Sequence, residues 1–204
     1  NHAEDKIIFV ELPFVPILEA LQENLKTVEK YVVLCEVNEM PETTLKSVIS
    51  YEEYIQDGDE NYSWPILEDD AACALCYTSG TTGNPKGVLY SHKSNVIHAQ
   101  AALTAMTIKP DDTILMVVPL FHVLAWGIPY FGPMNGLKLV MPGMQMEGEP
   151  LFELIDQEDV TLAFGVPTIW MGLLAYCRDN NKILSSVKNT IIGGSALSLA
   201  TLQE

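Results

Sequence analysis

A twelve-residue stretch from Tyr77 to Val88 concentrates residue types that bind phosphate groups. It reads Tyr-Thr-Ser-Gly-Thr-Thr-Gly-Asn-Pro-Lys-Gly-Val. Glycine lets the backbone approach a ligand closely and adopt positive φ, and successive backbone N–H groups form an anion-binding nest. The Ser and Thr hydroxyls add hydrogen-bond donors, and Lys86 adds a positive charge. This composition predicts a polyphosphate site.

The spacing of this loop differs from that of a Walker A loop. The Walker pattern G-x-x-x-x-G-K-[ST] fails because Gly83 is followed by Asn-Pro-Lys-Gly. The alternative is a hydroxyl-rich surface loop without a ligand, which the particular order and spacing of the residues disfavour.

The charge of the chain restricts its partners. The net charge is −16 over 204 residues. Residues 1–70 contain 17 acidic and 4 basic residues, whereas residues 71–204 contain 10 and 7. An acidic chain repels a phosphate backbone, so we expect no nucleic-acid partner. A phosphate site must therefore create its own local positive potential.

Cys73 and Cys76 form a C-x-x-C pair, which raises the question of metal or redox chemistry. The surrounding residues 71–77 have the pattern of a buried strand, on which positions three apart face opposite sides. A second C-x-x-C or His pair is absent. We therefore expect no metal site and reduced cysteines, which is typical of a cytoplasmic protein.

The 25 residues between Asp112 and Lys138 contain no Asp, Glu, Lys or Arg. A membrane span is one interpretation. Prolines, a histidine and Gly127 interrupt the stretch at turn-like positions, which favours a buried strand, a loop and a helix instead. We expect no transmembrane segment.

Strand-like and helical patterns alternate along the chain. We expect strands at 6–10, 31–35, 71–77, 87–90, 113–118, 137–141, 161–166 and 189–193. We expect helices at 14–25, 51–56, 92–106, 123–131, 150–157 and 168–177, and another that starts at 197. Ser91 is a suitable N-cap, and Pro167 suits a first helical turn. The alternation predicts an α/β layered fold with a largely parallel sheet, divided into an acidic βα subregion with a surface linker at 1–70 and a second subdomain at 71–204.

Residues 77–88 resemble the phosphate-loop signature of the acyl-adenylate-forming superfamily, the AMP-binding enzymes. The segments Pro119–Gly127, Gly165–Thr168 and Gly193–Ala196 resemble further core segments of that superfamily. The pattern F-H-x-x-A-W-G followed by G-V-P-T-x-W is most similar to bacterial medium- and long-chain fatty-acid CoA ligases. Leu124 stands where those enzymes usually have Asn, and their Pro after Gly-Gly-Ser-Ala is missing.

The resemblance implies two half-reactions with ATP, Mg²⁺ and CoA. A carboxylate attacks the α-phosphorus of ATP to give acyl-AMP and pyrophosphate, and the CoA thiol then displaces AMP. The phosphate contacts are expected from Thr78, Ser79, Gly80, Thr81, Thr82, Gly83 and Lys86. The acyl pocket is expected at His122, Trp126, Gly165 and Val166, and the turn against adenine and the acyl group at Gly193, Gly194, Ser195 and Ala196.

His122 and Trp126 each have a structural alternative. His122 is expected at the acyl pocket rather than in the core, and Trp126 either walls a lipid tunnel or belongs to the core. His92 and His98 are six residues apart and lack metal-ligand spacing, so we expect exposed or capping roles. Superfamily members that activate amino acids use a carboxylate where His122 stands. A neutral, fatty acyl tail is therefore expected, since an unpaired buried ammonium is costly.

The superfamily's remaining motifs do not occur before Glu204. They include the catalytic Lys of a small C-terminal domain, so the chain is expected to be part of a large N-terminal domain, with no certain catalytic residue and no activity alone. The alternatives are an aryl- or short-acid CoA ligase, or a non-catalytic nucleotide-binding module. The expected partners are small molecules in the cytoplasm, with peripheral membrane contact left open.

Overall fold

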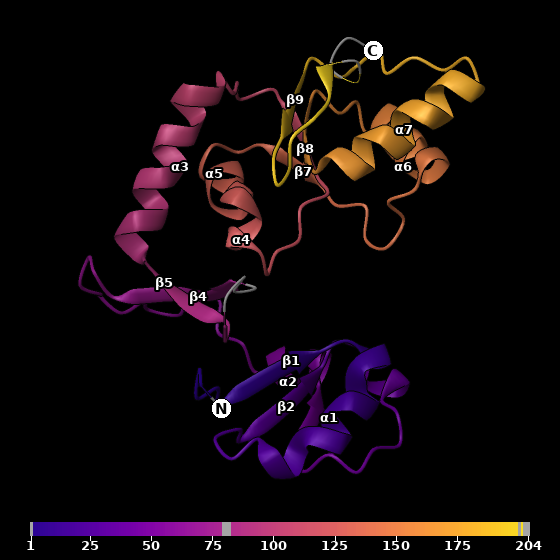
Figure 1. The fold of residues 1–204 in the computed structure, drawn as a ribbon. Helices are drawn as coiled ribbons and strands as arrows, with labels where there is room; N and C mark the ends of the chain where they lie inside the picture. Colours follow the sequence, from indigo (N-terminus) through magenta and orange to yellow (C-terminus); the bar gives the residue numbers. More distant parts are fainter. Residues whose placement is uncertain (1, 79–82, 200, 202–204) are drawn as a thin grey trace. The chain divides into compact units, whose positions relative to one another are not determined.

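The computed structural model describes residues 2–78, 83–199 and 201, and divides into two compact units (Figure 1). The first unit covers residues 1–66 and the second covers residues 67–204. Among the described residues, the first unit contains one sheet and one cluster of buried apolar side chains, and the second contains two sheets and two such clusters. Ser79, Gly80, Thr81 and Thr82 of the expected phosphate loop lie outside the described residues.

The first unit is a three-stranded parallel sheet of β1 (Ile7–Val10), β2 (Lys30–Val33) and β3 (Val48–Ser50), in that order. It also contains α1 (Val15–Leu21), α2 (Tyr51–Ile55) and the 3₁₀ turns η1 (Leu12–Phe14), η2 (Gln22–Asn24) and η3 (Val37–Glu39). The expected helix at 14–25 is thus one α-helix flanked by two 3₁₀ turns. The strand β3 was not predicted, because its three residues follow a polar segment.

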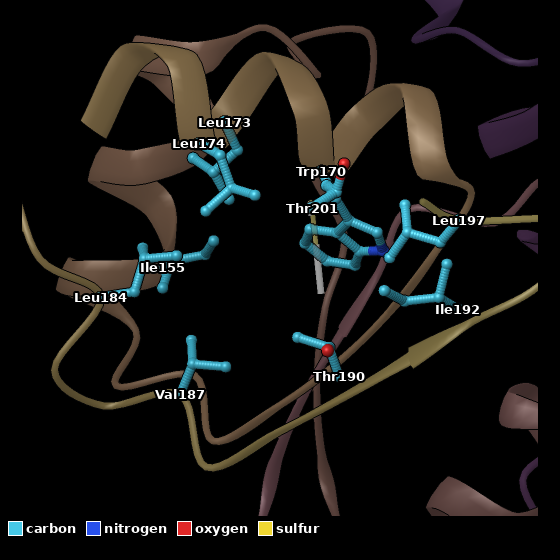
Figure 2. Close-up of a pocket in the computed structure, with 10 residues that line it drawn as sticks. All are labelled: Ile155, Trp170, Leu173, Leu174, Leu184, Val187, Thr190, Ile192, Leu197 and Thr201. Carbon is cyan, nitrogen blue, oxygen red and sulfur yellow. The ribbon is translucent and has the colours of Figure 1, made fainter. Parts of the chain in front are cut away.

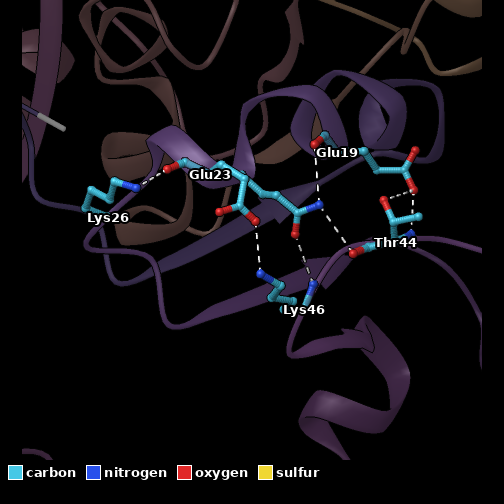
Figure 3. A network of polar contacts seen from close by, with 6 residues as sticks. Glu19, Glu23, Lys26, Thr44 and Lys46 are labelled. Atoms are coloured by element: carbon cyan, nitrogen blue, oxygen red, sulfur yellow. Dashed lines mark hydrogen bonds and ion pairs between the residues drawn. The ribbon is translucent and has the colours of Figure 1, made fainter.

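The carboxylate of Glu19 on α1 fixes the segment that leads into β3 (Figure 3). It accepts hydrogen bonds from the Thr43 hydroxyl at 2.8 Å and the Thr44 backbone N–H at 2.6 Å. Lys46 forms an ion pair with Glu23 at 2.9 Å. The hydrogen bonds from Thr44 and Thr43 outweigh burial and lower the pKa of Glu19. This network places residues 43–46 against α1.

The second unit begins with an antiparallel pair, β4 (Ala72–Thr78) and β5 (Lys86–Ser91). Helix α3 (His92–Met106) follows directly, with the bounds that the sequence predicts. The Ser91 hydroxyl accepts a hydrogen bond from the Ser94 backbone N–H at 3.1 Å, and Ser94 Oγ accepts one from the Ser91 backbone N–H at 3.1 Å. This reciprocal capping starts the helix immediately after the strand.

A four-stranded parallel sheet forms the rest of the second unit. Its strands are β6 (Thr113–Met116), β7 (Lys138–Val140), β8 (Leu162–Gly165) and β9 (Asn189–Ile192), in the order β7-β6-β8-β9. The connecting helices are α4 (Val123–Trp126), α5 (Ile128–Met134), α6 (Gly148–Gln157) and α7 (Pro167–Asp179). The fold is therefore α/β with parallel sheets, as the alternating pattern predicts.

Alternation along β6 explains why both faces of this sheet are covered. Ile114 and Met116 pack with α3 and α5, whereas Leu115 and Val117 pack with α6 and α7. Successive side chains of a strand point to opposite faces, and a parallel sheet with helices on both sides is apolar on both. This explains the uncharged run that begins after Asp112. Within the described residues, no helix is both long and apolar enough to cross a membrane.

Candidate active site

The strand order places a topological switch point at the carboxyl ends of β6 and β8. The chain leaves β6 toward α5 on one face of the sheet and leaves β8 toward α7 on the other. In open α/β sheets, ligands bind where neighbouring strands lead to opposite faces. Three of the four segments singled out in the sequence follow β6, β8 and β9 at this edge.

Trp126 and Gly193 are in close contact at this edge. A Cβ atom on Gly193 would lie 2.9 Å from Trp126 Cη2, a distance that real Cβ atoms do not show. The backbone N–H of Gly193 donates to the Gly165 carbonyl at 3.3 Å, and a Cβ on Gly194 would lie 3.2 Å from Val166 Cγ1. The structure therefore brings together Trp126, Gly165, Val166, Gly193 and Gly194.

Trp126 is half-buried and also contacts the sheet. Its ring packs edge to face on Phe164, with 6.5 Å between ring centroids. One side of the indole thus belongs to the core, and another lies against the backbone of the Gly193 turn. The core interpretation thus describes one side of the Trp126 ring, and the interpretation of Trp126 as the wall of a lipid tunnel stays a prediction.

His122 lies outside the core. It is exposed and immediately precedes α4, and its backbone N–H donates to the Pro119 carbonyl at 3.1 Å. The neighbouring Phe121 is 81% exposed. These two large side chains lie on the surface after β6, where a ligand could reach them. Ser195 and Ala196 are likewise exposed, beyond the Gly193 turn.

The backbone of α4 is left-handed, which corrects the expected continuous helix at 123–131. Val123, Leu124, Ala125 and Trp126 have φ values of 51°, 52°, 46° and 57°. Left-handed geometry costs L-residues about 1–2 kcal/mol each. Backbone strain of this kind is concentrated at functional sites. Gly127, with φ of 82°, then allows the right-handed α5 to begin.

The phosphate loop connects the ends of β4 and β5. Thr78 and Lys86 lie opposite each other in the antiparallel register, and both are exposed. The described residues of the loop therefore present a hydroxyl and an ammonium group at one end of the strand pair. Such donors suit phosphate oxygens. The described residues of the loop and the sheet edge belong to the same unit.

Comparison with known proteins identifies the family. The family model described as "AMP-binding enzyme" matches residues 1–204. The chain belongs to the AMP-binding enzyme family.

Among its relatives, a 3-methylmercaptopropionyl-CoA ligase of Ruegeria pomeroyi is 46% identical over 198 residues, which are 96% of this chain and 37% of the relative. A medium-chain-fatty-acid–CoA ligase of Ectopseudomonas oleovorans is 44% identical over 100% of this chain and 38% of its own length. A long-chain-fatty-acid–CoA ligase of Thermus thermophilus is 39% identical over 96% of this chain and 35% of its own length. The chain therefore spans well under half the length of these relatives.

Solved structures share the fold. The inhibitor-bound N-terminal domain of FACL13 from Mycobacterium tuberculosis matches with a TM-score of 0.81 and 22% identity, over 98% of this chain and 47% of that one. The anthranilate CoA ligase AuaEII in complex with anthranoyl-AMP matches with a TM-score of 0.80 and 22% identity, over 97% of this chain and 38% of that one. At this identity, the likeness supports the fold alone.

Sequence reasoning missed the contact between His98 and Gly127. His98 is exposed on α3, as expected, but a Cβ atom on Gly127 would lie 2.5 Å from its Cε1 and Nδ1 atoms. The imidazole therefore occupies the space beside Gly127, directly after the left-handed turn. The signal in the sequence was the glycine directly after Trp126, since glycine often marks a position where another side chain approaches the backbone closely. His92, by contrast, is exposed in the first turn of α3.

The cysteine pair on β4 departs from strict alternation. The register of β4 shifts between Ala72 and Ala74, so Cys73 lies in an irregularity of the strand. Its Sγ accepts a hydrogen bond from Asn95 Nδ2 at 3.3 Å and lies 3.7 Å from Tyr130 Oη. Burial, then the hydrogen bond with Cys73 and the thiols of Cys73 and Cys76, raise the pKa of Tyr130 to about 12. Both thiols thus affect Tyr130, which an alternating strand does not predict.

The cysteines carry no metal-binding arrangement in the part of the chain that is described. All four are free. Among the described residues, no group of three or more His, Cys, Asp or Glu side chains is placed so that it could hold a metal ion. Mg²⁺ generally binds to proteins together with the phosphates of ATP. The donor groups described here belong to Thr78 and Lys86, and they suit the phosphates rather than the metal ion.

Proposed function

We propose that the protein is an AMP-forming acid–CoA ligase that activates medium- or long-chain aliphatic acids. The observation that carries this proposal is the wall at the carboxyl edge of the sheet, where Trp126 lies against Gly193 beside Val166. This wall is apolar and uncharged. It suits a hydrocarbon chain better than a charged or strongly polar substrate.

Two half-reactions follow from this assignment. The acid's carboxylate oxygen attacks the α-phosphorus of ATP, the bond to the β-phosphate bridging oxygen breaks, and pyrophosphate leaves. The CoA thiol, losing its proton, then attacks the acyl carbonyl and AMP departs. Thr78, Lys86, Gly83 and the intervening residues 79–82 are proposed to hold the phosphates and to neutralise charge that develops on them. Mg²⁺, when bound with ATP, supplies further charge neutralisation.

His122 supports an uncharged acyl tail. It occupies the exposed position after Phe121, where relatives that activate amino acids are expected to carry a carboxylate for the substrate ammonium. No opposite charge is offered by this residue. We propose that His122, Trp126, Gly165 and Val166 line the acyl site and that Gly193, Gly194, Ser195 and Ala196 form the turn between the acyl group and adenine.

The length of the acid is the finer part of the proposal. Relatives of similar identity are named for a medium-chain fatty acid, a long-chain fatty acid and 3-methylmercaptopropionate. The last name favours a second candidate, a ligase of short acids. For the first candidate, the ligase of medium- or long-chain acids, we propose a cytoplasmic location with access to membranes that supply fatty acids.

A panel of acids tests the proposal on the full-length protein. Acid-dependent AMP release is measured with linear acids of two to eighteen carbons, with benzoate and with 3-methylmercaptopropionate. The highest kcat/KM is expected for linear acids of medium or long chain. A maximum at benzoate or at the shortest acids contradicts the proposed substrate class, and no AMP release with any acid favours a non-catalytic nucleotide-binding module.

Lys86→Ala tests the phosphate loop in the same assay. We expect the first half-reaction to fall by roughly a hundredfold, since a charge-assisted contact to the phosphates is lost. Lys93→Ala is the matched control, because Lys93 forms an exposed ion pair with Asp69 at 3.6 Å, a kind of contact that contributes little. Equal activity of the two variants contradicts the assignment of the loop.

A further inference from the structure

The imidazole of His98 on α3 packs against the backbone of Gly127, the residue between the left-handed turn α4 and the right-handed helix α5. A Cβ atom at position 127 would lie 2.5 Å from both Cε1 and Nδ1 of this ring. Real Cβ atoms do not come this close to another heavy atom. The edge of the imidazole therefore takes the space that a side chain at position 127 would need.

The packing of α3 on α5 fixes the place of this imidazole. Ala99 and Ala102 on α3 share a buried cluster with Ile128 and Phe131 on α5 (Figure 1). Small side chains at a helix contact let the two helices approach closely. His98 is directly before Ala99, so the core contact that joins the two helices also holds the ring beside the start of α5.

Hydrogen bonds hold the backbone of Gly127 from two further directions. Its carbonyl accepts from the backbone N–H groups of Tyr130 at 3.0 Å and Phe131 at 3.1 Å, which ties it to α5. Its own N–H donates to the Leu124 carbonyl at 2.9 Å, which closes the turn. The imidazole adds a contact from α3. Gly127 is thus the point at which α3, α4 and α5 meet.

The turn that ends at Gly127 carries Trp126. The four residues of α4 all have positive φ, and strained backbone of this kind persists only where the surrounding structure holds it in place. Trp126 must reach Phe164 on one side and Gly193 on the other. If the turn relaxed toward right-handed geometry, the direction of its side chains would change, and the indole would leave Gly193.

We propose that His98 is a positioning residue for the acyl wall. Its imidazole holds Gly127 and the left-handed turn, and this keeps Trp126 against Gly193. His98 acts through Trp126 rather than by touching the acid. The inference rests on the proposed function, because that function makes Trp126 part of the acyl site.

Amide hydrogen exchange in the full-length protein tests whether His98 holds the turn. The N–H groups of Ala125 and Gly127 donate to carbonyls within the turn, that of Ala125 to the His122 carbonyl at 3.1 Å. In His98→Ala, exchange of these two N–H groups is expected to become about fivefold faster, because the turn opens more often. This measurement requires no substrate.

Two variants and one helix serve as controls for the exchange measurement. His98→Phe keeps a planar ring beside Gly127, so exchange in the turn should stay within about twofold of the unsubstituted protein. His92→Ala makes the same change as His98→Ala at an exposed position in the first turn of α3, and it should leave the turn unchanged. Helix α7, whose Trp170 and Leu173 pack on the opposite face of the sheet (Figure 2), should exchange equally in all variants.

Steady-state kinetics of AMP release test the link to the acid. In His98→Ala, KM for the best linear acid of the panel is expected to rise about fivefold, while kcat and KM for ATP stay within about twofold. A wall that binds the hydrocarbon tail contributes equally before and during the reaction, so its distortion appears in KM. General damage to the fold would change kcat and KM for ATP as well. His98→Phe should restore KM for the acid.

A double-mutant cycle tests the contact itself. Gly127→Ala introduces strain, because φ is 82°, and a clash with the imidazole. In the His98→Ala background the strain remains but the clash is gone. The loss of kcat/KM caused by Gly127→Ala should therefore be about fivefold smaller in that background.

Four results overturn the proposal. They are unchanged exchange of the turn in His98→Ala, equal effects of His98→Phe and His98→Ala, an equal loss from Gly127→Ala in both backgrounds, and faster exchange without any rise of KM for the acid. If Gly127→Ala does not fold, the other three comparisons decide. If the unsubstituted protein releases no AMP with any acid, the proposed function fails, and hydrogen exchange still decides whether His98 holds the turn.

Discussion

Trp126 and Gly193 are matched in size at the carboxyl edge of the sheet. The indole edge occupies the space that a side chain at position 193 would need. Any side chain there must displace the tryptophan, which also packs on Phe164. The shape of the proposed acyl wall therefore depends on the absence of a single methyl group.

Gly193→Ala should lower activity with the preferred acid. The new Cβ atom would lie 2.9 Å from Trp126 Cη2, and overpacking of this kind costs about 1–3 kcal/mol. We expect kcat/KM for the acid to fall roughly tenfold, measured by acid-dependent pyrophosphate exchange. Gly172→Ala is the control, because a Cβ at that position meets no atom within 4 Å. Equal effects of the two substitutions contradict the proposed wall.

Asp112 stabilises the opposite edge of the same sheet. Its carboxylate accepts hydrogen bonds from the Thr161 hydroxyl at 2.7 Å and the Lys109 backbone N–H at 2.8 Å. Burial alone would raise the pKa of Asp112, but these hydrogen bonds and the positive charges of Lys188 and Lys109 lower it below its ordinary value. The charged form is therefore the one that the fold favours.

Asp112→Asn should destabilise the protein in a pH-dependent way. The folded-state pKa lies below an unfolded value of about 3.9, so the carboxylate stabilises the fold above that pH and loses its effect as pH falls through the folded-state pKa. We expect the substitution to lower the free energy of unfolding by about 1–2 kcal/mol at pH 7, as measured by urea unfolding. This difference should become smaller below a pH of about 4. Asp111→Asn, at an exposed position, should show no such dependence; a constant difference across pH for Asp112→Asn would contradict the role of its charge.

At the scale of elements, the backbone of α4 shows the physical consequence of a departure from the expected family pattern. Leu124 stands where similar enzymes are expected to have Asn, and its backbone is left-handed, with φ of 52° and ψ of 45°. Asn adopts this conformation far more readily than Leu. The sequence records the departure but not the backbone conformation that gives it a physical meaning.

Leu124→Asn should therefore stabilise the protein. Relief of left-handed strain is expected to raise the free energy of unfolding by about 1 kcal/mol, measured by chemical denaturation. Leu154→Asn is the matched control in the right-handed helix α6, where the same change should destabilise because Leu154 packs against a core cluster. Destabilisation by Leu124→Asn to the same degree as the control would argue against a strained turn.

Local signals decide which elements the sequence predicts well. Helix α3 has the predicted bounds because Ser91 and Ser94 cap its start. The left-handed turn and the irregularity at Cys73 were missed, since each arises from tertiary packing that overrides a local pattern. Strand β3 has three residues and gives too short a pattern to recognise.

At the scale of the whole molecule, each unit is supported by apolar clusters of its own. Val10, Val15 and Val33 belong to a cluster in the first unit, while the clusters on either side of β6 belong to the second. The sequence places the candidate residues on their segments. It does not show that Trp126 meets Gly193, because that contact depends on the order β6-β8-β9 of strands distant in the chain.

Glu19→Gln tests the independence of the first unit. The substitution removes a carboxylate whose pKa is lowered by hydrogen bonds from Thr44 and Thr43. The stabilising effect of this carboxylate is therefore present at neutral pH and is lost as pH falls through the folded-state pKa of Glu19. We expect faster amide hydrogen exchange at residues 43–50 at pH 7, with exchange in β6 and β8 unchanged. Glu52→Gln, at an exposed position of α2, is the control. Faster amide hydrogen exchange in β6 and β8 would indicate that the two units unfold together, which would contradict the independence of the first unit.

The most direct test of the central claim is the structure of the full-length protein bound to a non-reactive acyl-adenylate analogue, an acylsulfamoyl adenosine with an eight-carbon chain. The distances from the acyl carbons to Trp126 and to Trp170 are the decisive measurement. The account predicts that the chain contacts Trp126, Val166 and the Gly193 turn, with the sulfamoyl group near Thr78 and Lys86. An acyl chain on the opposite face of the sheet, against Trp170, would contradict it.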